Sequence, residues 1–372
     1  MRAYLLLMGI AFVVTFLATY VVRRAAVKYE IYPKDIRSRD SHSIPTPRIG
    51  GIAMFLGFLV SLAIAVPIGW FDVVFADPGP IIAIGVSALI IMVIGFFDDI
   101  YDLDWTLKLA GQFLAAGVLA VNGVQIVSLP IFGLTVGSFG VSFVVTVFLA
   151  VLIMNAVNFI DGLDGLVAGV VLIGTIVFFV YSYLLAQQIS PTNYFNLATM
   201  ISAIVIGMCA GFLPHNWHVA KIFMGDSGAM LLGLLMTTSA LTVTGQIDPA
   251  ALNRDDLVPA VLPLILPISI LILPLLDFAL AVVRRLAAGK SPFAADRMHL
   301  HHRLQDFGHT HLGSVLVFYL WSFSVSVSCL LLFLTDLGWV ILFSTLSVSA
   351  SLTYTVWPSL IKFSKRRKAL NV

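Results

Sequence analysis

Long, mostly apolar stretches recur along the whole chain and dictate its fold class. A helix that crosses a membrane needs about 20 consecutive apolar residues, and lipid offers no partner for open backbone groups. Hydrophobic residues make up 60% of the chain and charged residues only 11%, with a mean hydropathy of +1.02. The sequence therefore predicts an all-α polytopic membrane protein with about eleven transmembrane helices, ten being the alternative count. The predicted spans are residues 3–22, 50–70, 80–97, 108–121, 140–157, 165–186, 194–213, 227–246, 258–283, 312–334 and 338–361.

The basic residues give the orientation of these spans. Lys and Arg beside a span are retained in the cytoplasm. With the loop after the first span inside, 19 of the 21 Lys and Arg and all eight His lie on the cytoplasmic side, and only Arg2 and Arg254 lie outside. We therefore expect the N-terminus outside, the C-terminus inside, and an active site at the cytoplasmic face. We expect one integral membrane domain over residues 1–372 and no nucleic-acid partner.

Polar residues gather in five predicted cytoplasmic segments, at about residues 23–49, 98–108, 155–165, 214–227 and 284–311. In the first, His42 and Arg48 suit an anionic group such as a phosphate. The paired glycines Gly50 and Gly51 would let the backbone approach a neighbour closely where the second span begins. A proline-kinked loop with positive charges is the alternative for this segment.

The second segment places Asp98 and Asp99 side by side at the cytoplasmic end of a span. Carboxylates in that position are costly unless they bind a cation or exchange protons. Their mutual repulsion should raise the pKa of one of them, which suits a general base. Lys108 and Gln112 follow, and a solvated helix end is the alternative.

In the third segment, Asn155, Asn158, Asp161 and Asp164 recur every three residues. On a helix they would form one polar stripe. Glycines follow both aspartates, so we expect the helix to break there and free backbone groups for a ligand.

In the fourth segment, Asp226 or Ser227 is expected to cap the eighth span. The N-terminus of that helix would then offer free N–H groups and a positive dipole end to phosphate oxygens. Phe223 is expected either to stack on a base or to pack at the membrane interface.

The fifth segment contains His299, His301, His302 and Arg303. The histidine spacing admits zinc as an interpretation, but no Cys or Glu accompanies it, and the other segments offer the oxygen ligands that magnesium prefers. We favour a His/Arg clamp on a pyrophosphate over zinc or a solvated loop.

These segments read PTPRIGG, GFFDDIYDLDWTLKLAGQ, NAVNFIDGLDGL, KIFMGDSGAMLLG and DRMHLHHRL. In this order they resemble the motifs of the polyprenyl-phosphate N-acetylhexosamine-1-phosphate transferases, over about residues 33–310. That family includes the phospho-MurNAc-pentapeptide transferases (MraY type) and the GlcNAc-1-phosphate transferases (WecA type). The fifth motif lacks the three consecutive histidines of the MraY type, so the resemblance is to the WecA branch and implies UDP-GlcNAc as donor. Ser43 and Val219 depart from the pattern, where a basic residue and a proline are common.

The resemblance also implies roles for individual residues. Those roles are magnesium association for Asp226 and Asn158, an essential pair in Asp98 and Asp99, the nucleotide pocket for Asp161, Asp164, Asn216 and Phe223, and contacts with phosphate and sugar for His301, His302 and Arg303. We add Lys108, His299, Arg48 and His42 as substrate-binding candidates.

We thus expect a Mg²⁺-dependent enzyme, with Mn²⁺ as a substitute, in the bacterial inner or plasma membrane. It would join GlcNAc-1-phosphate to undecaprenyl or decaprenyl phosphate and release UMP. This is the first membrane step of a cell-wall polymer or surface glycan such as lipopolysaccharide, arabinogalactan or teichoic acid. Direct attack by the lipid phosphate and a covalent phospho-aspartyl intermediate both remain open. A homodimer is compatible with the sequence, although no feature establishes one.

Three alternatives are carried forward. The same chemistry could use UDP-MurNAc-pentapeptide or another UDP-N-acetylhexosamine. Asp98-Asp99-Ile-Tyr-Asp102 matches the DDxxD pattern of intramembrane prenyltransferases, but these need a second aspartate-rich segment. An ion-coupled transporter predicts carboxylates in mid-span, where only Asp277, towards the inner end of its span, comes close.

Overall fold

The computed structural model describes residues 1–31, 46–126, 138–189, 195–244, 262, 265–266, 268–269, 272–287, 289 and 300–370. Within these ranges the secondary structure is helical, with no strand, which confirms the all-α prediction. The elements are α1 (Arg2–Lys28), α2 (Gly50–Ala65), η1 (Gly69–Phe71), α3 (Asp72–Phe75), α4 (Pro78–Tyr101), α5 (Trp105–Val121), α6 (Phe139–Phe159), α7 (Leu166–Ile189), α8 (Leu197–Asn216), α9 (Gly225–Thr244), α11 (Ile272–Ala287), α12 (Leu300–Phe307), α13 (His311–Leu334) and α14 (Leu337–Leu370).

The lengths and hydropathies of these helices confirm a polytopic membrane protein. Among the described residues, eight helices are long and apolar enough to cross a membrane, or nine if α2 and the short helices after it form one bent span. The predicted span 50–70 is shorter as a helix than expected. It ends at Ala65 and the chain then bends by 93°, because Pro67 has no N–H with which to continue the helix. α5 has only 17 residues, and the expected span 258–283 lies partly outside the described residues.

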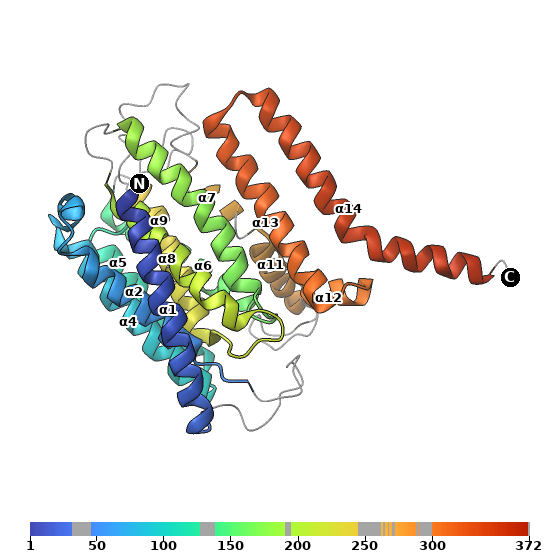
Figure 1. Cartoon of the computed structure of the whole chain (residues 1–372), viewed down its shortest axis with the longest axis horizontal. Coiled ribbons are helices and arrows are strands. Elements are labelled where there is room, and N and C mark those ends of the chain that lie inside the picture. Colours follow the sequence, from blue (N-terminus) through green and yellow to red (C-terminus); the bar gives the residue numbers. More distant parts are fainter. Residues whose placement is uncertain are drawn as a thin grey trace.

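α9 is the central helix of the bundle. It packs against α2, α4, α6 and α8 (Figure 1), and its side chains are almost all buried. Protein rather than lipid therefore surrounds it, including its hydroxyl-bearing residues. Thr237, Thr238 and Ser239 each donate to a carbonyl four residues earlier, at 2.8–3.0 Å, which satisfies those groups inside the bundle.

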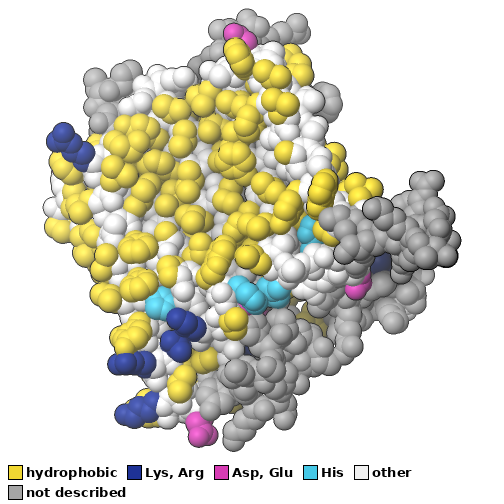
Figure 2. Space-filling model, turned by 45° about the vertical axis from the view of Figure 1, so that its right-hand side comes forward, with side chains coloured by type: hydrophobic (Ala, Val, Ile, Leu, Met, Phe, Trp, Pro, Cys, Tyr) yellow, Lys and Arg dark blue, Asp and Glu magenta, His cyan; other side chains and the backbone are white. Residues whose placement is uncertain are grey.

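Other helices face outward with apolar side chains. Only a small part of α14 is buried, and its C-terminal part bends away from the bundle (Figure 1), with Pro358 inside the helix. Figure 2 shows a broad hydrophobic face with histidine and basic side chains along its lower border. A hydrophobic face that ends in a polar border is what a lipid-facing surface requires.

Candidate active site

The N-terminus of α9 is held by the chain segment that leads into α2. The amide of Phe223 donates to the carbonyl of Pro47 at 2.8 Å, and the amides of Gly50 and Gly51 donate to the carbonyls of Phe223 and Met224 at 3.0 and 2.8 Å. A Cβ on Gly51 would overlap the Ser227 hydroxyl. The close backbone approach predicted for the glycine pair is therefore confirmed.

Asp99 caps α9 from the neighbouring helix α4. Its carboxylate accepts from the amides of Asp226 (2.7 Å) and Ser227 (3.2 Å) and from the Ser227 hydroxyl (2.8 Å). Gly225 precedes them with φ +70°, and a Cβ there would overlap this carboxylate. The prediction that Asp226 or Ser227 caps the helix is wrong. Both residues lie in its first turn, and Asp99 already occupies their N–H groups.

Asp98, Lys108 and Asp226 form a charged cluster beside this cap. Asp102 ends α4 in the left-handed conformation (φ 54°), and the chain turns back into α5. This turn brings the Lys108 ammonium to 2.8 Å from Asp98 and into contact with Asp226. Asp98 is buried, whereas Asp226 and Lys108 are partly exposed. Two neighbouring carboxylates repel each other unless a cation lies between them, and here the ammonium does.

The end of α6 completes the cluster. α6 ends at Phe159 and Gly165 takes φ +73°, so the predicted helix break is confirmed. Asn158 lies beside Asp226. Burial, followed by the negative charges of Asp226 and Asp164, raises the pKa of Asp161 to about 7, while Arg48 acts in the opposite direction. Arg48, Asp164 and Asp226 therefore all lie close enough to Asp161 to affect the charge of its carboxyl group.

Asn216 joins the loop after α6 to the loop after α8. Its amide oxygen accepts from Gly165 N at 3.0 Å, and its amide nitrogen donates to Ile222 O at 3.0 Å. Both ends of this buried amide are therefore used by backbone. In the predicted nucleotide pocket, Asn216 would therefore support the loops. The side chain of Phe223 is half-exposed beside these loops.

The region of the chain that matches known proteins includes the Asp98, Lys108 and Asp226 cluster. Residues 81–244 match glycosyl transferase family 4, a range that holds Asp98 through Ser227. The chain is 42% identical over 321 residues to the decaprenyl-phosphate N-acetylglucosaminephosphotransferase of Mycobacterium tuberculosis, covering 84% of this chain and 78% of that protein. It is 33% identical over 329 residues to the probable undecaprenyl-phosphate N-acetylglucosaminyl 1-phosphate transferase of Bacillus subtilis, covering 87% and 84%. This chain belongs to glycosyl transferase family 4.

This family 4 chain also holds a group that the sequence interpretation missed. His218 Nδ1 lies 2.9 Å from Asp164 Oδ2, which also accepts from the amide of Ala220 at 3.2 Å. The ring of His311 stacks on that of His218 with 4.9 Å between centroids. The only signal in the sequence was that both histidines fall on the predicted cytoplasmic side.

The fifth segment is only partly described. His42 and His299 lie outside the described residues, as do the side chains of His301 and His302. α12 carries these two histidines and the exposed Arg303, and it packs against α13 and α14. Its first amide, that of Leu300, donates at 2.9 Å to Asp277, a buried carboxylate on α11. The His/Arg clamp stays a prediction. Asp277, the carboxylate to which the transporter alternative pointed, has a structural role as the cap of α12.

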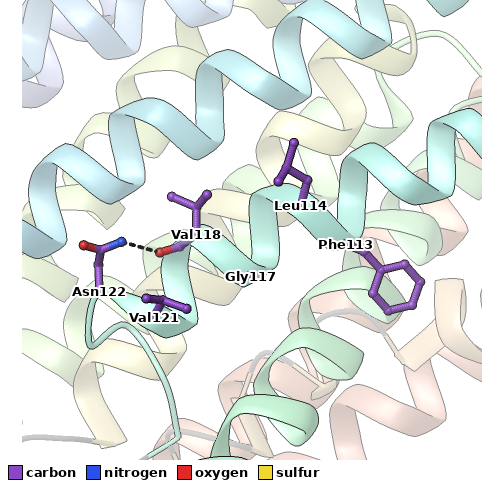
Figure 3. Close-up of a pocket in the computed structure, with 6 residues that line it drawn as sticks. All are labelled: Phe113, Leu114, Gly117, Val118, Val121 and Asn122. Carbon is purple, nitrogen blue, oxygen red and sulfur yellow. Dashed lines mark hydrogen bonds between the residues drawn. The ribbon is translucent and has the colours of Figure 1, made fainter.

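An apolar groove of about 340 Å³ runs along α5 (Figure 3). It is lined by Phe113, Leu114, Gly117, Val118, Val121 and Asn122. The amide of Asn122 turns back to donate to Val118 O at 2.8 Å. The groove thus offers a nucleotide no charged group, and the candidate active site of this family 4 chain is the cluster at the α9 N-terminus.

Proposed function

We propose that this chain transfers GlcNAc-1-phosphate from UDP-GlcNAc to a polyprenyl phosphate and releases UMP. The observation that carries the proposal is the Asp98–Lys108–Asp226 cluster, which lies in the segment matched by the family. The names of the relatives give a polyprenyl phosphate as the acceptor and N-acetylglucosamine phosphate as the transferred group. The UDP-linked form of the donor, and hence UMP as the leaving nucleotide, rests on the motif resemblance, and the choice of GlcNAc rests also on the fifth motif.

The cluster suits a hard divalent cation, and we propose Mg²⁺, with Mn²⁺ as a substitute. Asp226 and Asn158 would hold it with carboxylate and amide oxygens, the ligands that Mg²⁺ prefers. The Asp226 side chain is 30% exposed, so a ligand can reach it. Lys108, which now neutralises two carboxylates, marks the place where positive charge is required. A bound Mg²⁺ would offset the charge of the pyrophosphate during transfer.

The other steps of the transfer can be assigned to residues of the chain. An oxygen of the lipid phosphate attacks the β-phosphorus of UDP-GlcNAc, and the bond from that phosphorus to the bridging oxygen breaks, so that UMP leaves. Asp98 is the proposed base that takes the proton of the lipid phosphate, since Asp99 already accepts three hydrogen bonds. Lys108 would turn from the carboxylates to the phosphates once both substrates are bound.

The covalent route is constrained by the same contacts. A phospho-aspartyl intermediate needs a carboxylate oxygen free to attack phosphorus. Both oxygens of Asp99 accept from α9, so a covalent route would use Asp98 or Asp226. We favour direct attack, and trapping a sugar-phosphate adduct on either aspartate would contradict it.

We place this chemistry at the cytoplasmic face of the bacterial inner membrane. The proposal rests on the positive-inside distribution of Lys and Arg. It is also supported by the histidine and basic side chains along one border of the hydrophobic face in Figure 2. Labelling of single introduced cysteines from outside intact cells would test it, because residues beside Lys108 should stay unlabelled.

The test of the reaction uses purified chain in detergent with Mg²⁺. UDP-GlcNAc and UDP-MurNAc-pentapeptide are offered in parallel, each with decaprenyl or undecaprenyl phosphate, and UMP is quantified. We expect UMP from UDP-GlcNAc alone, reduced at least about 100-fold in Asp98→Asn and in Asp226→Asn. UMP from the pentapeptide donor would keep the chemistry and overturn the donor. Prenyl transfer without UMP would favour the prenyltransferase alternative.

A further inference from the structure

Asp164, His218 and His311 come from three separate parts of the chain and meet at one point. Asp164 lies in the loop after α6, His218 in the loop after α8, and His311 is the first residue of α13. Each offers one ligand atom, and the three atoms lie within 4.8 Å of one another. No part of the proposed phosphoryl transfer requires His218 or His311 to be there.

The donor set differs in kind from that of the Asp226 cluster. Two imidazoles and one carboxylate are ligands typical of zinc and other transition metals, whereas Mg²⁺ takes oxygen ligands. In a tetrahedral zinc site with bonds of about 2.0–2.2 Å, donor atoms lie roughly 3.4 Å apart. A small closing movement of the side chains would therefore produce a three-ligand site.

The group is both anchored and accessible. Asp164 is 2% exposed and is held by the amide of Ala220, so one ligand is fixed in place. The His218 side chain is 41% exposed, so an ion can arrive from the aqueous side. Its 2.9 Å contact with Asp164 is a hydrogen bond, and a metal ion would displace the proton within it.

We propose that Asp164, His218 and His311 form a transition-metal site of the zinc class, separate from the Mg²⁺ site at Asp226. An ion there links α13 to the loops that follow α6 and α8. One consequence rests on the proposed function. Asp164 is expected to line the nucleotide pocket, so zinc bound to its carboxylate should compete with UDP-GlcNAc.

The binding test uses the full chain in detergent, with its affinity tag removed and Mg²⁺ in excess. Cobalt is titrated and followed by its visible absorption, and zinc is counted by elemental analysis after gel filtration. We expect one ion per chain, with affinity lowered at least about 10-fold in His218→Ala and in His311→Gln. The matched control is His309→Gln. His309 lies two residues from His311, and the His309 ring contacts the carbonyl of Thr355 at 2.9 Å. This variant should bind cobalt like the unmodified chain.

The outcomes are distinct. Weak or absent cobalt binding by the unmodified chain, or equal binding by both histidine variants, overturns the site. Loss of cobalt binding in Asp226→Asn, with the histidine variants unaffected, places the ion in the carboxylate cluster and also overturns it. Gel filtration and thermal unfolding verify that each variant is folded, and Asp164→Asn serves if a histidine variant is not.

A separate activity assay tests the consequence. Zinc should inhibit UMP formation by the unmodified chain, and His311→Gln should need at least about 10-fold more zinc for the same inhibition. Cobalt binding without inhibition would support the metal site and overturn competition with the nucleotide. Absence of UMP under all conditions would count against the proposed function, but it would not change the conclusion about metal binding.

Discussion

Replacing Asp99 should destabilise the whole protein, because this residue holds the N-terminus of the central helix α9. Asp99→Ala leaves two amides and one hydroxyl in the first turn of α9 without their acceptor. Loss of a helix cap costs about 0.5–2 kcal/mol, and each buried donor left unsatisfied costs about 1–3 kcal/mol. Relief of a buried charge offsets part of this cost. The net loss in the free energy of unfolding should be about 2–4 kcal/mol.

The comparison with Asp98 gives this prediction its control. Asp98→Asn keeps an oxygen that can accept from the Leu103 amide, which lies 3.0 Å from Asp98 Oδ1, and leaves Lys108 in contact with Asp226. Its stability should therefore stay close to that of the unmodified chain, although its activity is lost. Asp99→Asn, which keeps one acceptor oxygen, should lie between Asp98→Asn and Asp99→Ala.

Thermal unfolding in detergent, followed by intrinsic fluorescence, measures the order of these variants. The estimated loss corresponds to a drop in Tm of roughly 3–5 °C for Asp99→Ala in a chain of 372 residues. An unchanged Tm for Asp99→Ala would refute the capping role. Equal destabilisation in Asp98→Asn would show that the two neighbouring aspartates do not divide into a cap and a base.

Three further predictions address other parts of the structure. Gly95→Ala places a Cβ against the Ser227 backbone and should lower stability by about 1–3 kcal/mol, whereas Gly85→Ala on the same helix α4 has open space and should be neutral in the same unfolding assay. Asp277→Ala should raise KM for UDP-GlcNAc several-fold with little change in kcat, because α12 loses its cap, and Asp277→Asn should restore KM in steady-state assays. Burial and nearby carboxylates raise the pKa of Asp161 to about 7, so its contribution to stability is present below about pH 4 and lost as the pH rises through 7. Asp161→Asn should therefore flatten the fall of Tm between these pH values in chelator, and an unchanged profile would contradict the assignment.

The helices and their breaks could largely be predicted from the sequence. Apolar length located the bundle helices, and glycines after Asp161 and Asp164 located the end of α6. The approach of Gly51 to α9 was also predictable, because a glycine pair at the start of a span has few other uses. These features depend on local composition, which the sequence displays directly.

The contacts between distant segments could not be predicted in this way. Asp99 and Asp226 are separated by 127 positions, and no local pattern shows that one caps the helix of the other. The same holds for His218, in the loop after α8, and His311, the first residue of α13. A positive-inside distribution places polar residues in one plane, but the packing of α4, α9 and α13 decides which of them touch.

The mass of the lipid product tests the central claim most directly. Purified chain, Mg²⁺, UDP-GlcNAc and a polyprenyl phosphate are incubated, and the lipid is examined by mass spectrometry while the released nucleotide is identified. Sugar-phosphate transfer predicts a polyprenyl diphosphate bearing GlcNAc, with UMP in equal amount. A polyprenyl monophosphate bearing GlcNAc, with UDP released instead, would show that only the sugar moves and would contradict the account.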